Sequence, residues 1–81
     1  EARVNAANVA MANGDYERAA EYLQGVPSSM PEAINSRGIL AMSQGNYSEA
    51  MTLFQQAERD GVSEATYNIG LLKELMNAQA Q

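Results

Sequence analysis

The chain has 81 residues, of which 46% are apolar and 19% charged, and its ten acidic and five basic residues give a net charge of −5. This length allows one small domain, and the apolar share is enough to build a core. The acidic balance argues against a nucleic-acid surface, which needs clustered lysine and arginine. Because the sequence has no cysteine and no histidine, disulfides, thiolate nucleophiles, Cys/His zinc sites and histidine bases are excluded.

The start of the chain resembles an internal segment. It opens at Glu1 with no initiator methionine, basic run or apolar run of the kind that begins a secretory leader. We therefore expect the chain to be part of a longer protein. We also expect no direct insertion into a membrane, because a spanning helix needs about 20 mostly apolar residues.

Apolar residues recur at helical spacing along the chain, which predicts five helices. In chain order we expect them at residues 1–13, 15–25, 31–44, 46–60 and 63–79. Residues 25–30 form the one extended connection. Pro31 suits the first turn of the third helix, because a missing N–H does no harm at that position.

Single glycines separate the expected helices. Gly14 and Gly45 are placed to end the first helix of a pair in the left-handed conformation, and Gly25 and Gly61 are placed to end the second. Gly14, Gly45 and Gly61 therefore predict short turns, and Gly25 begins the extended connection.

Polar residues after two of the glycines predict helix starts. Asp15 and Asn46 are expected to be N-caps, whose side chains accept from the first free N–H groups of a helix. Glu49, three residues after Asn46, completes the pattern of a capping box.

Two segments of the chain are similar to each other at a separation of 31 residues. The stretch 14–23 (GDYERAAEYL) resembles 45–54 (GNYSEAMTLF), with Gly, Tyr and Ala at the same places. Another set of similar segments occurs at residues 5–9, 36–40 and 68–72, with offsets of 31 and 32. Recurrence at nearly one period predicts a repeat protein made of stacked helix pairs.

The pattern of the repeat resembles the tetratricopeptide repeat. It has Gly-x-Tyr at the turn, a small residue three positions after the tyrosine, and an aromatic residue or leucine four positions further on. The second helix pair, about residues 32–61, is the better match and carries Gly38, Tyr47, Ala50, Phe54 and Ala57 at the signature places. The first pair carries Ala7, Tyr16, Ala19, Leu23 and Val26 at the same places.

This resemblance implies an all-α fold, a right-handed α-solenoid of antiparallel helix pairs. It divides a single domain, residues 1–81, into a first repeat over about 1–27, a second over about 31–61 and a half-repeat over about 63–79. The half-repeat is expected to be a capping helix. The side chains expected to cover the second pair are Ile69, Leu72, Leu75 and Met76.

Three positions of the repeat carry expectations about packing. Ala7, Gly38 and Gly70 are expected to let the two helices of a pair approach closely, since glycine within a helix costs about 0.5–1 kcal/mol and needs a reason. Arg37 stands where leucine is commoner in the family. Because burying a lone charge is costly, we expect Arg37 to reach solvent or to pair with an acidic side chain.

In tetratricopeptide arrays the first helices of the pairs line a concave surface that holds a peptide or a partner's helix. The matching positions here are Asn8, Met11, Asn35, Ile39, Met42, Tyr67, Leu71 and Glu74. Asparagine suits such a surface because its amide can pair with both N–H and C=O of a bound backbone. Exposed apolar side chains among these eight residues would form an apolar surface patch, and such patches usually mark interaction sites. The other interpretation is that these are solvated helix positions.

The resemblance implies a non-catalytic interaction module that binds a protein or peptide. Family members that bind acidic chaperone C-terminal tails clamp the terminal carboxylate with lysine and arginine, and neither stands at the matching positions here. With Glu32, Glu64 and Glu74 at the rim, the expected partner is an apolar or mildly basic segment. A second hypothesis is a structural spacer whose groove is occupied by the rest of its parent protein.

Catalysis is not expected from these residues. The serines have no histidine to activate them and suit helix caps and turns. Glu17 and Glu21 lie one helical turn apart, but two carboxylates are too few to hold a metal. We therefore expect no enzyme activity, no cofactor and no metal. The composition, poor in lysine and rich in Asn, Gln and Ala, is similar to short repeat arrays of bacterial envelope proteins, which favours the periplasmic side of the envelope over the cytoplasm.

Overall fold

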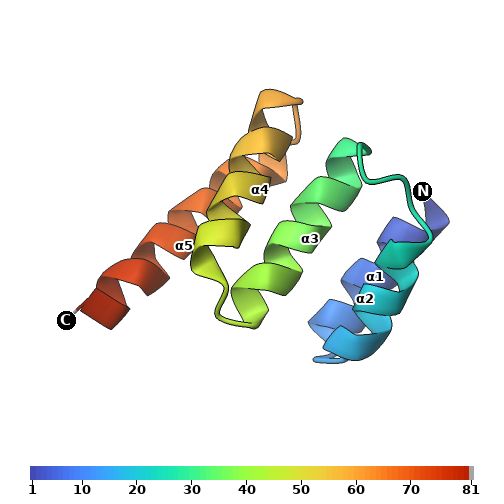
Figure 1. Ribbon diagram of the computed structural model, residues 1–81, viewed down its shortest axis with the longest axis horizontal. Coiled ribbons are helices and arrows are strands. Elements are labelled where there is room, and N and C mark those ends of the chain that lie inside the picture. Colours follow the sequence, from blue (N-terminus) through green and yellow to red (C-terminus); the bar gives the residue numbers. More distant parts are fainter. Residues whose placement is uncertain (81) are drawn as a thin grey trace.

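The computed structural model describes residues 1–80 and contains five helices. They are α1 (Ala2–Ala12), α2 (Tyr16–Gln24), α3 (Pro31–Ser43), α4 (Tyr47–Arg59) and α5 (Ser63–Ala80), and each follows the last in an up-and-down path (Figure 1). No strand occurs within these 80 residues. The expected all-α class is confirmed, and each helix begins and ends within about one residue of the predicted bounds.

The turns within the helix pairs show why glycine is needed. Gly14, Gly45 and Gly61 have φ values of +78°, +81° and +94°, which only glycine adopts without strain. After α1, Gly14 N donates to Met11 O (3.0 Å) and Asp15 N to Ala10 O (2.8 Å). This pair of hydrogen bonds is the Schellman motif, which satisfies carbonyl groups that the end of a helix leaves without a partner.

Gly25 ends α2 as expected, with φ −85°, whereas the side-chain cap expected at the start of α4 is absent. Asn46 occupies the N-cap position of α4 without a side-chain hydrogen bond, and no capping box with Glu49 forms. Asp15 does cap α2, since its Oδ1 accepts from Arg18 N at 3.3 Å. The turns at Gly14 and Gly45 therefore have the same left-handed glycine, but only the first is followed by a side-chain cap.

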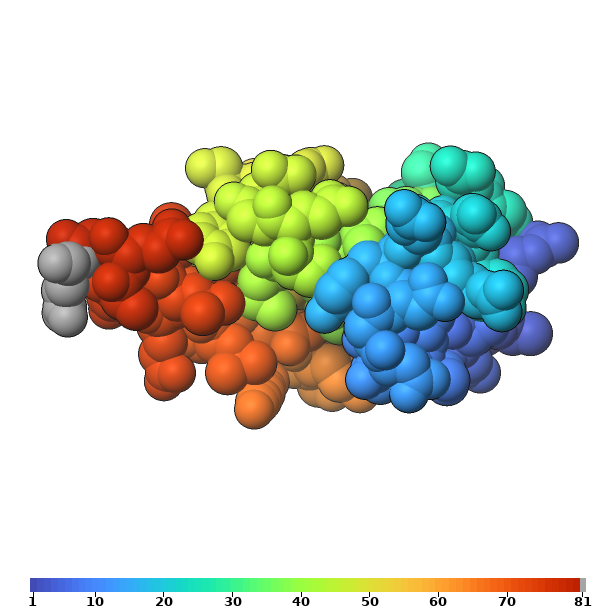
Figure 2. Space-filling model, turned by 90° about the horizontal axis from the view of Figure 1, so that it is seen from below, coloured from blue at the N-terminus to red at the C-terminus, as the bar shows by residue number. Residues whose placement is uncertain are grey.

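The helices form two layers along the long axis of the molecule, whose extents are 38 × 27 × 16 Å. α3 packs against all four other helices, whereas no Cα atom of α2 lies within 8 Å of one of α4 in the described residues. Figure 2 shows α1 and α5 toward one edge and α4 toward the other. The odd-numbered helices thus share one face of the array, and α2 and α4 share the opposite face.

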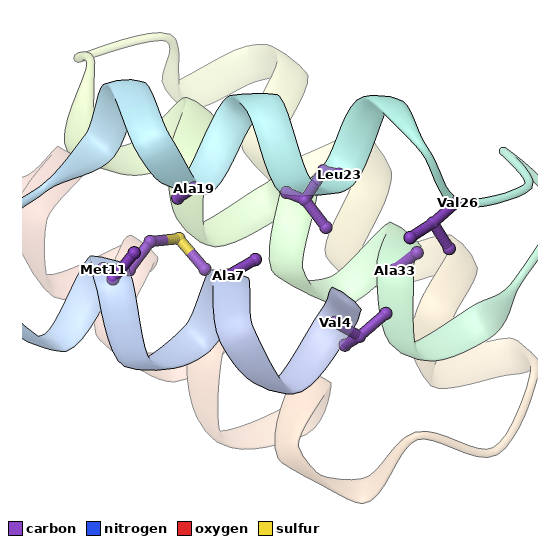
Figure 3. Packing of buried hydrophobic residues seen from close by; sticks show 8 residues of the cluster. Val4, Ala7, Met11, Ala19, Leu23, Val26 and Ala33 are labelled. Carbon is purple, nitrogen blue, oxygen red and sulfur yellow. The ribbon is translucent and has the colours of Figure 1, made fainter. Parts of the chain in front are cut away.

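The core of the first pair joins α1 and α2. Val4, Ala7 and Met11 of α1 point toward Ala19 and Leu23 of α2, and all are buried (Figure 3). Val26 and Ala33 extend this cluster to α3. Because one apolar stripe of each helix is covered by the next helix, the array buries a continuous core.

The core of the second pair depends on Gly38. A Cβ built at this position would lie 2.5 Å from Cε1 of Phe54, whose side chain is fully buried. The expectation that a small residue lets α3 and α4 approach closely is confirmed here. The space that a side chain would occupy is filled by the phenylalanine ring.

The last helix covers the second pair with only part of its expected face. Ala65 and Leu72 are fully buried and Ile69 is half-buried, but Leu75 and Met76 are exposed. They are exposed because the final turns of α5 extend beyond α4 (Figure 1). Gly70 has nothing within 4 Å of a built Cβ, so its expected close approach is also wrong.

Arg37 takes neither of the two positions expected for it. The side chain is half-buried, and its Nη2 donates to the backbone oxygens of Leu23 (2.8 Å) and Val26 (3.2 Å) instead of pairing with an acid. Arg3 of α1 donates from Nη1 to Gly25 O at 2.7 Å. Two arginines from neighbouring helices thus stabilise the C-terminal end of α2, where carbonyl groups and the negative end of the helix dipole attract cations.

Candidate partner-binding groove

A cavity of about 400 Å³ opens on the face formed by the odd-numbered helices. Its walls come from the C-terminal half of α1, the middle of α3 and the first turns of α5, with Tyr16 at the start of α2. The lining side chains are Asn8, Met11, Ala12, Tyr16, Asn35, Ile39, Glu64 and Asn68. We call this cavity the α1–α3–α5 groove.

Two hydrogen bonds orient the amides of the α1–α3–α5 groove. Ser36 Oγ donates to Asn8 Oδ1 at 2.7 Å, and Asn68 Nδ2 donates to Asn35 Oδ1 at 3.1 Å. Each bond joins neighbouring odd-numbered helices. The acceptor oxygens of Asn8 and Asn35 are used in this way, so their Nδ2 groups remain as donors toward a ligand.

Four of the eight predicted site residues line the same cavity. These are Asn8, Met11, Asn35 and Ile39. Asn8 is exposed, but the other three are less exposed than a binding surface would suggest: Met11 belongs to the first core, Asn35 is only 9% exposed and Ile39 is half-buried. Neighbouring helices cover them, and sequence spacing alone does not reveal that cover.

The other four predicted residues lie outside the cavity. Met42 is half-buried and packs on the core of the second pair. Tyr67 (60% exposed), Leu71 (38% exposed) and Glu74 are on the surface of α5. The expected apolar patch of Ile39, Met42, Tyr67 and Leu71 is therefore reduced mainly to two exposed side chains on one helix.

Sequence reasoning missed Asn68 and Ser36 as members of the site. Both begin one of the similar segments at residues 36–40 and 68–72. In the structure both donate to an asparagine on the preceding odd-numbered helix. A polar residue that returns at the start of each segment was the available signal.

The charges and donors of the groove limit its chemistry. Its lining holds one carboxylate, Glu64, and neither lysine nor arginine. Within residues 1–80 no group of three or more acidic side chains could hold a metal ion. No helix in the described part of the chain is both long and apolar enough to cross a membrane. The groove thus offers hydrogen bonds, apolar contact and a weak negative potential.

The comparisons with known proteins point to the same family as the repeat pattern. Residues 1–26 match the family model described as tetratricopeptide repeat. These residues contain α1, α2 and the Gly14 turn, whereas the sequence pattern favours the second pair as the better match. No curated protein and no solved structure matches the chain.

Tetratricopeptide repeats generally mediate interactions between proteins and are generally non-catalytic. The matched segment is one complete helix pair, and α3–α5 continue the same up-and-down path. Residues 1–26 are therefore similar to a tetratricopeptide repeat, and the five helices of this all-α chain fit a helical-repeat solenoid.

Proposed function

We propose that this chain is a non-catalytic interaction module whose α1–α3–α5 groove binds an apolar or mildly basic segment of a partner protein. The observation that carries this proposal is the set of amides in the groove. Asn8 and Asn35 line the cavity, and because their Oδ1 atoms accept from Ser36 and Asn68, their Nδ2 groups are left as donors for a ligand. Such donors suit the carbonyl oxygens of an extended peptide backbone.

The charge of the groove supports the expected ligand. Glu64 is exposed at the rim, no cation lines the cavity, and the chain as a whole carries −5. An acidic segment would be repelled, and a terminal carboxylate would find no lysine or arginine in this groove. Met11, Ala12 and Ile39 supply apolar contact to the side chains of the ligand.

The test is a selection from a random peptide library displayed on phage, using the 81-residue chain as the target. We expect the enriched peptides to be apolar with zero or positive net charge. Their affinity should fall about tenfold for Glu64→Lys, because this change reverses the charge of the groove. Glu21→Lys is the matched control: it makes the same change in net charge on exposed α2 and should leave binding unchanged.

Two outcomes would contradict the proposal. Enriched peptides that bind both lysine variants as well as the unchanged chain would place the binding site outside the groove. No enrichment at all would favour the structural spacer, whose groove is filled by its own parent protein.

A further inference from the structure

The first helix pair forms one end of the array (Figure 1) and carries a cavity of its own, of about 340 Å³. All residues that line this cavity belong to α1, to α2 or to the turn between them. We call it the α1–α2 end pocket. Val9 of α1 is 61% exposed in it, and Tyr22 of α2 is half-buried.

Another cavity, of about 380 Å³, shows what the end pocket corresponds to. It is lined by residues of α2, α3 and α4, and we call it the α2–α4 pocket. Most residues of the end pocket stand 31 positions, one repeat, before a residue that lines the α2–α4 pocket. In the end pocket these residues are Ala6, Val9, Ala10, Asn13, Arg18 and Tyr22. Their counterparts are Arg37, Leu40, Ala41, Gln44, Glu49 and Leu53.

The α2–α4 pocket has a second wall that the end pocket lacks. Its remaining lining residues are Ala20, Leu23 and Gln24, all from α2 of the preceding pair. Leu40 packs on the core of that preceding pair and is half-buried, whereas Val9 at the same repeat position is mostly exposed. The end pocket is therefore one half of an interface between pairs, and the missing half is a helix like α2.

We propose that the α1–α2 end pocket is the docking surface for a preceding helix pair of the same repeat. The second helix of that pair presents a small residue and, three positions later, a leucine, as α2 presents Ala20 and Leu23. Covering the apolar end of one pair with the next is what stabilises a helical-repeat array. This inference goes beyond the function proposed for the α1–α3–α5 groove and does not depend on it.

A second copy of this chain offers no free helix of that kind within residues 1–80. Leu23 of α2 and Phe54 of α4 hold the same repeat position and are 2% and 0% exposed, because α3 packs against α2 and α5 against α4. The repeat period instead places the occupant directly before Glu1. Residues 1–2 (EA) recur 31 positions later as residues 32–33 in the first turn of α3, which follows a complete pair.

Two residue differences distinguish the end pocket from the α2–α4 pocket. Ala6 stands at the position of Arg37, whose guanidinium donates to two carbonyl oxygens at the C-terminal end of α2. Arg18, whose side chain is 66% exposed, stands at the position of Glu49. The docked helix is therefore held without a guanidinium, and a neutral or acidic residue suits the place that Gln24 has in α2.

The experiment duplicates the first pair in register. Residues 1–31 are joined directly before Glu1, which keeps the period and gives the end pocket a helix with the sequence of α2. Amide hydrogen exchange of α1 and α2 in the original copy should slow at least about tenfold relative to the 81-residue chain, because their opening must then also break the new interface. Segmental isotope labelling of the original copy separates its NMR signals from those of the added copy.

Variants in the original copy make the test decisive. Val9→Glu should remove the slowing in the tandem chain and leave exchange in the 81-residue chain unchanged, because Val9 is exposed there. Met76→Glu is the matched control, since Met76 is 39% exposed on α5 and does not line the end pocket. Ala6→Arg, which copies Arg37, should slow exchange severalfold further in the tandem chain only.

Three results would overturn the proposal. They are an added pair that stays unfolded by circular dichroism, an added pair that folds without slowing exchange, and a slowing that persists with Val9→Glu. Sedimentation tests the other occupant. A dimer of the 81-residue chain that Val9→Glu dissociates would assign the end pocket to a second copy and would also overturn the proposal.

Discussion

The two complete helix pairs, α1–α2 and α3–α4, fill the space between their helices with different side chains. In α1–α2 the small position is Ala7 and the large one is Leu23; in α3–α4 they are Gly38 and Phe54. The methyl group that Gly38 lacks is replaced by ring atoms of Phe54, which lie where a Cβ would be. The repeat therefore conserves the total volume at the interface and not the identity of either residue, as expected for interiors packed at near-crystal density.

Removing the large residue of each pair should have the largest effect. Phe54→Ala is expected to lower the free energy of unfolding by about 3–5 kcal/mol, because the fully buried ring leaves a cavity beside a glycine that cannot fill it. Leu23→Ala should cost less, since it removes a smaller side chain and Ala7 already occupies part of the space. Urea denaturation followed by circular dichroism measures both. An equal loss for the two variants would contradict the difference between the pairs.

Adding a methyl group at the small position of the second pair should have the next largest effect. Gly38→Ala places a Cβ 2.5 Å from Phe54 Cε1 and is expected to destabilise by about 1–3 kcal/mol through overpacking. Combined with Phe54→Leu, which copies the Ala7/Leu23 combination, it should recover much of that loss. If the changes in unfolding free energy of Gly38→Ala and Phe54→Leu are strictly additive in the same measurement, the two side chains do not compete for the same space.

The two turns differ in their caps, which predicts a smaller effect. Asp15→Ala should cost about 1 kcal/mol, because the Asp15 carboxylate accepts from the backbone of α2. Asn46→Ala should cost much less, since its side chain makes no such bond to α4. Thermal denaturation of the two variants gives the comparison, and a larger loss for Asn46→Ala would show that the cap forms in solution.

Gly70 should respond to alanine in the opposite direction from Gly38. It lies within α5 with nothing within 4 Å of a built Cβ, so Gly70→Ala is expected to stabilise by about 0.5–1 kcal/mol through helix propensity alone. The denaturation midpoint should rise without a change in slope. A loss of stability would mean that another surface packs on this glycine, and sedimentation would then reveal association.

Half of the candidate groove was predictable, because the resemblance to the tetratricopeptide repeat implies a shared surface for Asn8, Asn35 and Ile39, and all three line the same cavity. Asn8 is exposed, but the burial of Asn35 and the partial burial of Ile39 were not predictable, since they depend on which neighbouring helix covers these side chains. The bond from Asn68 to Asn35 spans 33 residues, and no pattern within one helix indicates it. The exposure of Leu75 and Met76 follows from α5 being longer than its neighbour, which the apolar spacing does not express.

The sequence by itself determined the number of helices, their bounds and the repeat, because these depend on local interactions. A left-handed glycine, a proline in a first turn and a helical stripe act within a few residues of the chain. Tertiary structure alone decided where Arg37 binds and how the α2–α4 pocket arises. The carbonyls that hold Arg37 belong to Leu23 of α2 and to Val26 just after it, 14 and 11 residues away, and a guanidinium finds such acceptors only when the helices have packed.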